Sequence, residues 1–203
     1  NEFIKIAAKP RSYIGIGAIT LIVGIVLFAM KMDGKMYISF ITAPFEQSLS
    51  FEGNILNGNL MAFIILQMLI IHVPLLIAFV TGDLISGEGA MGTIRLLLTK
   101  PISRTSILLS KYLAGCAYTL IVLLWLGFMA IFIGKQMFGA GDLMVLNSDG
   151  LIILQESDIG WRFFYGFLLA YLALVMIATL SLTLSCFSEN SIGPIVSTMG
   201  III

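Results

Sequence analysis

The sequence has few of the charged residues that a water-soluble protein needs. Charged residues make up 11% of its 203 residues and hydrophobic residues 59%, and the mean hydropathy is +1.07. An ordinary soluble domain has about 25% charged and roughly 45 to 50% apolar residues. A single core facing water could not bury this much apolar surface, so lipid must cover much of it. The composition therefore indicates an integral membrane protein, and its formal net charge of +0 gives no field that would attract nucleic acid.

The sequence also lacks the residues of the common catalytic, metal and phosphate sites. It has one histidine, His72, and two cysteines, Cys116 and Cys186, which stand in or beside apolar runs without metal-ligand spacing. No G-x-x-x-x-G-K-[ST], H-E-x-x-H or C-x-x-C pattern occurs. We therefore expect this chain to be no enzyme and to hold no metal or cofactor. If the protein uses ATP, another chain must bind it.

Four windows meet or approach the length of a membrane-spanning helix, which is about 20 mainly apolar residues. They are Tyr13–Met30, Asn59–Val80, Tyr112–Gly134 and Phe163–Ser185. A fifth window, residues 192–203, is too short to cross, so we expect a chain cut short at its C-terminus, and the start without Met suggests trimming there as well. The predicted fold is all-α: a polytopic membrane helix bundle of four complete spans and a truncated fifth, forming one transmembrane domain over residues 1–203.

The four windows contain no Asp, Glu, Lys or Arg, and their readily titratable group is His72. Ion-coupled transporters usually keep carboxylates or bases near the midplane, although each costs roughly 2.5 to 3.5 kcal/mol on insertion scales. A proton or sodium site is therefore not expected, and we interpret His72 as a helix-packing residue. Pro74 cannot donate to the carbonyl of Ile70, so we expect a kink in the second helix.

The lysines and arginines of the connecting segments predict the orientation. Seven lie on the side that holds the N-terminus and residues 81–111, and four lie on the other side. Because the side richer in Lys and Arg faces the cytoplasm, we expect a cytoplasmic N-terminus in a multi-pass protein of the cell membrane, in bacteria the inner membrane. The aromatic run Trp161–Tyr165 fits the outer boundary.

The segments outside the windows suggest further short helices. The stretch NEFIKIAAKPRS interleaves apolar residues with Lys5 and Lys9, which indicates an amphipathic helix in the cytoplasmic interface, with Pro10 at the turn into the first span. A frayed tail is the alternative. The outer segments, residues 31–58 and 135–160, hold Gly, Asn, Asp and Ser around short apolar patches, and we expect small re-entrant or surface helices there.

One stretch, EGAMGTIRLLLTKPISR at residues 88–104, interrupts the apolar runs with charge, glycine and proline. At about 3.6 residues per turn, Glu88, Gly92 and Arg95 share a polar stripe opposite an apolar arc. We therefore expect an amphipathic cytoplasmic helix that Pro101 ends, with Gly92 open to the close approach of another backbone. A solvated loop with accidental periodicity is the alternative.

This stretch, followed by an apolar helix that Lys111 opens, resembles the cytoplasmic segment between spans two and three of type-2 ABC transporter permeases. The layout is similar too, although that family usually has six spans. The resemblance implies a permease subunit that pairs with a second permease, as a homo- or heterodimer, and with two separate ATPase subunits that bind ATP and Mg. It also implies a coupling segment, whose candidate residues here are Glu88, Gly92, Thr93, Arg95, Pro101 and Arg104.

The sequence pattern and the resemblance together predict a subunit of an ATP-driven exporter. In it, closure of the ATPases would push this segment, and rigid helices would transmit the motion to the transport path. The uncharged spans suit an amphipathic or apolar solute, and lipids, peptides, drugs and polysaccharides all stay open. No substrate-binding residue is predicted. Two other classes also stay open: an ion-coupled secondary transporter or channel, and a membrane scaffold or assembly subunit that uses the segment only to dock a partner.

Overall fold

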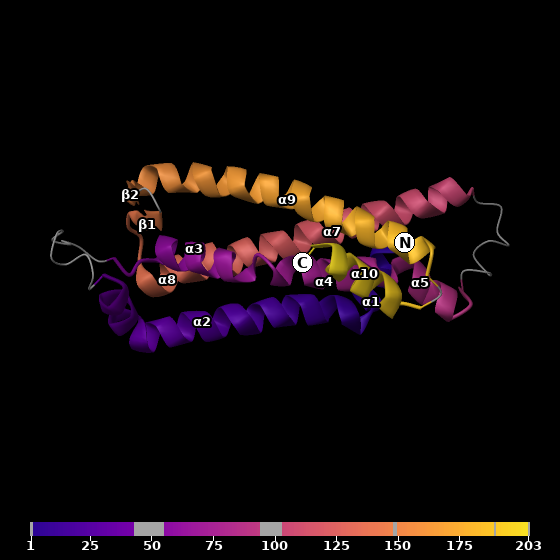
Figure 1. Cartoon of the computed structure of the whole chain (residues 1–203), viewed down its shortest axis with the longest axis horizontal. Helices are drawn as coiled ribbons and strands as arrows, with labels where there is room; N and C mark the ends of the chain where they lie inside the picture. The colour runs from indigo at the N-terminus through magenta and orange to yellow at the C-terminus, as the bar shows by residue number, and fades with distance from the viewer. Residues whose placement is uncertain (1, 43–54, 94–102, 148–149, 189, 203) are drawn as a thin grey trace. The chain divides into compact units, whose positions relative to one another are not determined.

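The computed structural model describes residues 2–42, 55–93, 103–147, 150–188 and 190–202. Nearly all of their regular structure is helical (Figure 1). The chain divides into two compact units, the first made of residues 1–17, 70–123 and 168–203 and the second of residues 18–69 and 124–167. Each unit is described by itself. The prediction of one domain over the whole chain stays a prediction.

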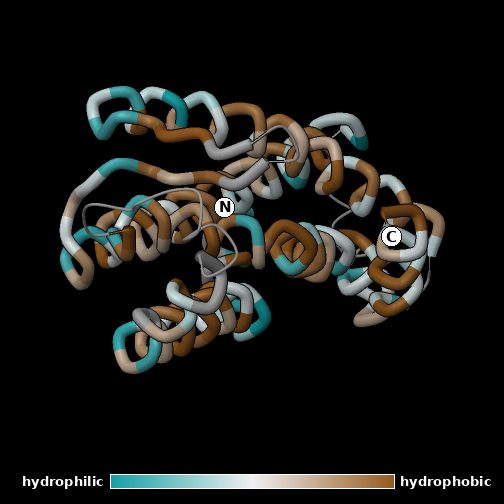
Figure 2. Tube along the Cα trace, turned by 60° about the vertical axis from the view of Figure 1, so that its left-hand side comes forward, coloured by the Kyte–Doolittle hydropathy of each residue, from teal (hydrophilic) through white to brown (hydrophobic). Residues whose placement is uncertain are grey.

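Four helical stretches of the described residues are long and apolar enough to cross a membrane: Pro10–Gly34, His72–Ala90, Arg104–Phe138 and Glu156–Cys186. Hydrophobic residues run along these helices in Figure 2. In the stretch His72–Ala90, 67% of the most apolar window is buried, against 22% to 33% in the other three. This stretch is therefore the most enclosed, and the others leave apolar sides for lipid or protein to cover. The prediction of an all-α polytopic membrane bundle is confirmed.

The first unit holds the N-terminal helix and the enclosed stretch. Helix α1 (Glu2–Ala8) is followed at once by α2 (Pro10–Thr42), which begins at the proline because the first turn of a helix needs no N–H there. The short N-terminal helix and the turn at Pro10 are thus confirmed. The other elements that contribute to this unit are α4 (His72–Thr81), α5 (Asp83–Ala90), the first part of α7 (Arg104–Gly127), the last part of α9 (Glu156–Cys186) and α10 (Ile192–Ile202).

Close packing in the first unit centres on Gly82, between α4 and α5. A Cβ at this position would lie 2.9 Å from the Ser181 hydroxyl and 3.1 Å from a side-chain carbon of Ile195. The glycine therefore lets α9 and α10 approach the enclosed stretch closely. The buried apolar side chains Ile77, Leu84 and Leu182 pack in the same unit.

The second unit is built around the start of α3 (Gly58–Leu69). Asn57 caps this helix, because its Oδ1 accepts a hydrogen bond from Leu60 N at 2.9 Å and its Nδ2 donates to Asp142 O at 2.6 Å. The π-helical turn η1 (Phe128–Ile133), α8 (Gly134–Phe138), and the strands β1 (Leu143–Asn147) and β2 (Gly150–Leu154) complete the unit together with parts of α2, α7 and α9. Helix α3 packs on η1, α8 and β1.

The second predicted span, Asn59–Val80, is not one continuous helix. The chain turns at residues 70–71 and splits this window into α3 and α4, and the apolar stretch long enough to cross continues instead from His72 to Ala90. The break has the expected cause, because Pro74 has no N–H to donate to the carbonyl one turn earlier. The extension to Ala90 was missed because Asp83 and Glu88 read as residues outside the membrane.

The prediction of small helices in the segment 135–160 is only partly right. Helix α8 ends at Phe138, and β1 and β2 then form an antiparallel hairpin in which Val145 pairs with Ile152. The β-branched residues Val145, Ile152 and Ile153 favour strands over a helix here. In the segment 31–58, α2 continues to Thr42.

Candidate functional site

The structure describes the two ends of the segment that the sequence singled out. Helix α5 ends at Ala90, and Gly92 then adopts φ +70°, a conformation that ends a helix and favours glycine. The predicted continuous stripe through Glu88 and Gly92 is therefore wrong. Gly92, Thr93 and Arg104 are exposed, whereas Arg95 and Pro101 lie outside the described residues. Their assignment to a coupling segment stays a prediction.

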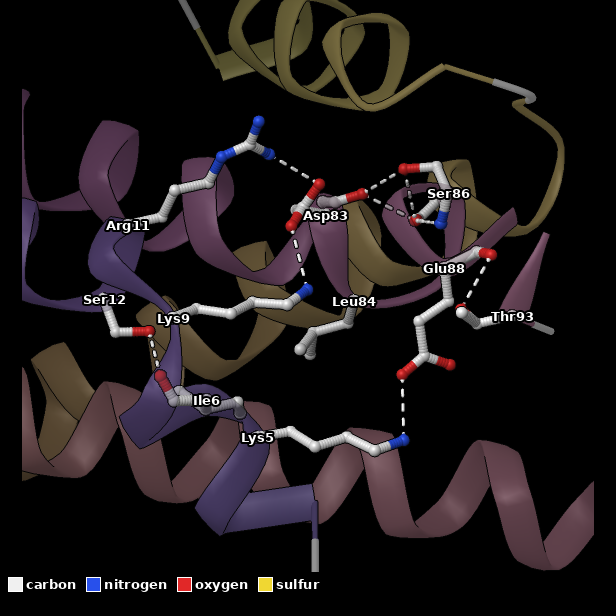
Figure 3. Close-up of polar contacts among 12 residues, drawn as sticks. Lys5, Ile6, Lys9, Arg11, Ser12, Asp83, Leu84, Ser86, Glu88 and Thr93 are labelled. Carbon is white, nitrogen blue, oxygen red and sulfur yellow. Dashed lines mark hydrogen bonds and ion pairs between the residues drawn. The ribbon is translucent and has the colours of Figure 1, made fainter. Parts of the chain in front are cut away.

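Glu88 faces the interior, away from the exposed turn. Its carboxylate oxygens lie 3.1 Å from Lys5 Nζ of α1 and 2.8 Å from Lys111 Nζ of α7. Figure 3 shows the Lys5 side chain reaching the Glu88 carboxylate from α1. The backbone of Glu88 meanwhile accepts a hydrogen bond from Thr93 Oγ1 at 3.1 Å, which holds the exposed turn against the end of α5. Glu88 thus connects the turn to two other helices.

Lys111 is almost completely buried, with 1% of its side chain exposed. Besides Glu88, its ammonium donates to Leu84 O at 2.6 Å and pairs with Glu2 at 3.3 Å. The buried ammonium thus makes two hydrogen bonds and an ion pair with Glu88 at 2.8 Å. Lys111 therefore joins α7 to both α1 and α5.

Glu2 and Lys5 of α1 lie outside the membrane-spanning stretches and stabilise each other's charge at 2.9 Å. Partial burial alone would raise the pKa of Glu2, but hydrogen bonds and attraction from Lys5 and Lys111 outweigh it and hold this pKa below its ordinary 4.5. The hydrogen bond to Glu2, with a further one to Glu88, raises the pKa of Lys5 above its ordinary 10.5. Both groups are therefore charged around neutral pH.

Asp83, the first residue of α5, holds the turn between α1 and α2. Its two carboxylate oxygens lie 3.1 Å from Lys9 Nζ and 2.6 Å from Arg11 Nη1, as Figure 3 shows. Ile6 O accepts hydrogen bonds from Lys9 N at 3.2 Å and from Ser12 Oγ at 2.6 Å, so the turn is fixed to α1 as well. The start and the end of α5 are thus each tied to the N-terminal segment.

We call the seven charged residues of this cluster the ionic junction: Glu2, Lys5, Lys9, Arg11, Asp83, Glu88 and Lys111. Its four cations and three carboxylates nearly balance in charge. The ionic junction therefore connects helices and is not a strongly charged site that would attract anions or cations. Within the residues that the structure describes, no group of three or more His, Cys, Asp or Glu is placed to hold a metal.

A second set of contacts ties α5 to α9. The Ser185 hydroxyl of α9 donates to Gly82 O at 2.6 Å and accepts from Ser86 N at 2.9 Å, and Ser181 donates to Ala78 O at 3.0 Å. These serines are buried. Helix α5 is therefore held on both sides, by charges from α1 and α7 and by hydroxyls from α9.

The sequence analysis did not predict that the residues of the ionic junction pair with one another. The sequence analysis used Lys5, Lys9, Arg11 and Lys111 as orientation signals, Lys5 and Lys9 also for the amphipathic N-terminal helix, and Lys111 also as the residue that opens the third span. It assigned no role to Asp83. A usable signal was present, because Lys111 stands within a helix whose next turns are apolar. A lysine there needs either the membrane surface or a buried acid.

The fold and the junction define a multi-pass helical membrane protein whose charged groups gather around the ends of one enclosed helix. The chain belongs to the family described as "Protein of unknown function (DUF2705)", which matches residues 17–203.

Two curated proteins are similar to parts of this chain. "Uncharacterized protein YhcI" of Bacillus subtilis (strain 168) is 29% identical over 117 residues, which are 55% of this chain and 37% of that protein. "Probable ABC transporter permease protein NosY" of Stutzerimonas stutzeri is 34% identical over 91 residues, which are 44% of this chain and 33% of that protein. The matched stretches thus span about a third of the length of each relative. No solved structure gives a significant match.

Proposed function

We propose that this chain is the transmembrane permease subunit of an ATP-driven ABC transporter, with ATP and Mg bound by separate ATPase subunits. The observation that carries the proposal is the 34% identity to a protein named as a probable ABC transporter permease. The bundle of apolar helices supports it, since a permease subunit must line or flank a path through the bilayer.

In this proposal the segment between α5 and α7 docks on the ATPase from the cytoplasmic side. The exposed residues Met91, Gly92, Thr93 and Arg104 at its two ends support this role. Glu88 contributes by holding the turn from behind, since its carboxylate is occupied by lysines. The candidates Arg95 and Pro101 remain part of the docking segment as a prediction from the resemblance.

The ionic junction gives such docking a mechanical consequence. A load on an isolated loop would be absorbed by the loop, whereas α5 is fixed at both ends to neighbouring helices. Displacement of the turn would therefore move α1, α7 and α9 together as packed elements. We further propose that the transporter is an exporter and that a second permease subunit, identical or different, completes the path. Its substrate stays open.

The first test is purification of the tagged chain from its native membranes. We expect ATPase activity to accompany it, to require a co-purified ATPase subunit, and to be absent from the isolated chain. If transport instead follows an imposed ion gradient and persists with a catalytically dead ATPase, the chain belongs to a secondary transporter.

The docking surface needs a substitution that does not strain the turn. Gly92→Trp is unsuitable because the positive φ alone would destabilise it. Met91, which is 64% exposed, is better: Met91→Asp should reduce the amount of co-purified ATPase severalfold. Met36→Asp is the matched control, because Met36 is 75% exposed on α2 beyond the first span. Equal ATPase recovery from both variants would place docking elsewhere.

The proposed orientation has its own test. With single cysteines, Thr93→Cys should react with a membrane-impermeant maleimide only from the cytoplasmic side, and Asp142→Cys only from outside. Both residues are exposed, so accessibility reports the side of the membrane. The reverse pattern would overturn the cytoplasmic N-terminus and with it the docking surface.

A further inference from the structure

Lys111 differs from the other cations of the ion pairs in the described structure. Its ammonium is almost completely removed from solvent, while Lys5, Lys9, Arg11 and Arg162 each keep a part-exposed or exposed side chain. It donates hydrogen bonds to Leu84 O and Glu2 and forms an ion pair with Glu88 at 2.8 Å, and each of these partners belongs to α1 or α5. One side chain of α7 therefore holds two other helices.

Stability alone does not account for such a residue. Removing a lysine and a glutamate from water costs several kcal/mol each, and apolar residues of similar volume often serve equally well or better. What an ion pair with fixed hydrogen bonds adds is geometry, because it sets which groups face each other. At Lys111 the fixed geometry lies between the end of α5, which leads into the exposed turn, and α7.

We propose that Lys111 is the positioning residue that transmits displacement of the α5 end to α7. The inference rests on the proposed function, because the displacement would come from the ATPase. When the turn after Ala90 moves, Glu88 and Leu84 O move with α5, and the ammonium that they share pulls α7 along. Glu2 adds the N-terminal helix to the same movement.

A role limited to charge neutralisation makes a different prediction. If Lys111 only compensated Glu88, removing both charges would restore everything that removing one had disturbed. Lys111→Met keeps most of the length of the side chain but leaves Glu88 with Lys5 as its cation. Adding Glu88→Gln removes the stranded carboxylate, and Glu2 and Lys5 still pair with each other.

The chain supplies its own reporter of α7, since Cys116 lies on that helix a little more than one turn beyond Lys111. In a Cys186→Ser background, the reaction of Cys116 with N-ethylmaleimide is timed with and without a non-hydrolysable ATP analogue. The sample is the complex with its ATPase in lipid nanodiscs. We expect a nucleotide-dependent rate ratio in the parent. In the double variant this ratio should fall about fivefold or more, toward one, while thermal stability recovers relative to Lys111→Met.

Arg162→Met is the matched control, because it removes a cation from an exposed pair, and its ratio should equal that of the parent. The inference is overturned if the double variant regains the nucleotide-dependent rate ratio of the parent. It is also overturned if the reaction rate of Cys116 in the parent ATPase complex does not depend on nucleotide. Absence of any ATPase from the parent preparation would instead defeat the proposed function, so the two failures are distinguishable.

Discussion

Replacement of Asp83 by asparagine should loosen the N-terminal helix. Asparagine keeps the size of the side chain and one accepting oxygen but removes the charge that faces Lys9 at 3.1 Å and Arg11 at 2.6 Å. The turn between α1 and α2 would then lose the ionic attachment to α5, and α1 should open more often.

The magnitude follows from how much solvent reaches each partner. At about 3 Å and an effective dielectric constant near 20, each contact amounts to roughly 5 kcal/mol of Coulomb energy before desolvation is counted. The Asp83 side chain is only 8% exposed, but those of Lys9 and Arg11 are 29% and 46% exposed and regain water when released. The expected loss therefore lies between the roughly 0.2 to 1 kcal/mol of an exposed pair and the roughly 3 to 5 kcal/mol of a broken buried pair, at about 1 to 3 kcal/mol.

Hydrogen exchange measures this local opening directly. A loss of about 1 to 3 kcal/mol corresponds to a roughly 5- to 150-fold faster exchange of the α1 amides if exchange follows the opening equilibrium. The assay is mass spectrometry of peptides covering residues 2–8, with the protein in nanodiscs. Asp158→Asn is the control, because Asp158 pairs with Arg162 in an exposed i,i+4 contact and should leave α1 unchanged. Equal α1 exchange in both variants would refute the reasoning that ion pairs hold this helix.

Further predictions concern pH and glycine. Because the folded-state pKa of Glu2 is lowered and that of Lys5 is raised, their contribution to α1 stability should be complete between pH 4.5 and 10.5, and should be lost below this window through Glu2 and above it through Lys5. The measurement is hydrogen exchange of the α1 amides, corrected for the effect of pH on intrinsic exchange. Stronger protection of these amides below pH 4.5 than inside the window would contradict this prediction. Gly58→Ala places a Cβ 2.5 Å from a backbone carbon of α8 and should cost about 1 to 3 kcal/mol in thermal unfolding, whereas Gly24→Ala meets nothing within 4 Å and should be neutral or stabilising. Gly92→Ala should destabilise by roughly 1 to 2 kcal/mol through its positive φ, and Gly92→Asn by less, as a thermal shift would show.

Local chemistry made part of the fold predictable. Pro10 and Pro74 each restrict the backbone whatever surrounds them, so the start of α2 and the break before α4 follow from sequence. Long apolar windows likewise identified the helices that contain Tyr112–Gly134 and Phe163–Ser185. These features depend on neighbours in the chain, which sequence patterns report well.

The rest of the fold depends on partners far away in sequence. Asp83 and Glu88 are paired with cations that stand 72 to 83 residues earlier, and Glu88 also with Lys111, which follows it by more than 20 residues. Hydropathy counts both acids as interruptions, because it assigns a charge the same cost with or without a counter-ion. The interior placement of Glu88, and with it the ionic junction, therefore could not be read from the periodicity of residues 88–104.

The long separations within the ionic junction have a consequence for how the protein is made. Lys5 and Glu88 are 83 residues apart, and Glu2 and Lys111 are 109 apart. At about 5 to 20 residues per second of synthesis, the charges of α1 wait roughly 5 to 20 seconds for their final partner to leave the ribosome. Until residue 83 has been made, Lys9 and Arg11 lack their partner Asp83, and unpaired positive charges beside a first span are of the kind that can orient it during insertion. If the first span has the orientation that we propose, a charge removed at Lys9 or Arg11 would affect insertion before it affects packing.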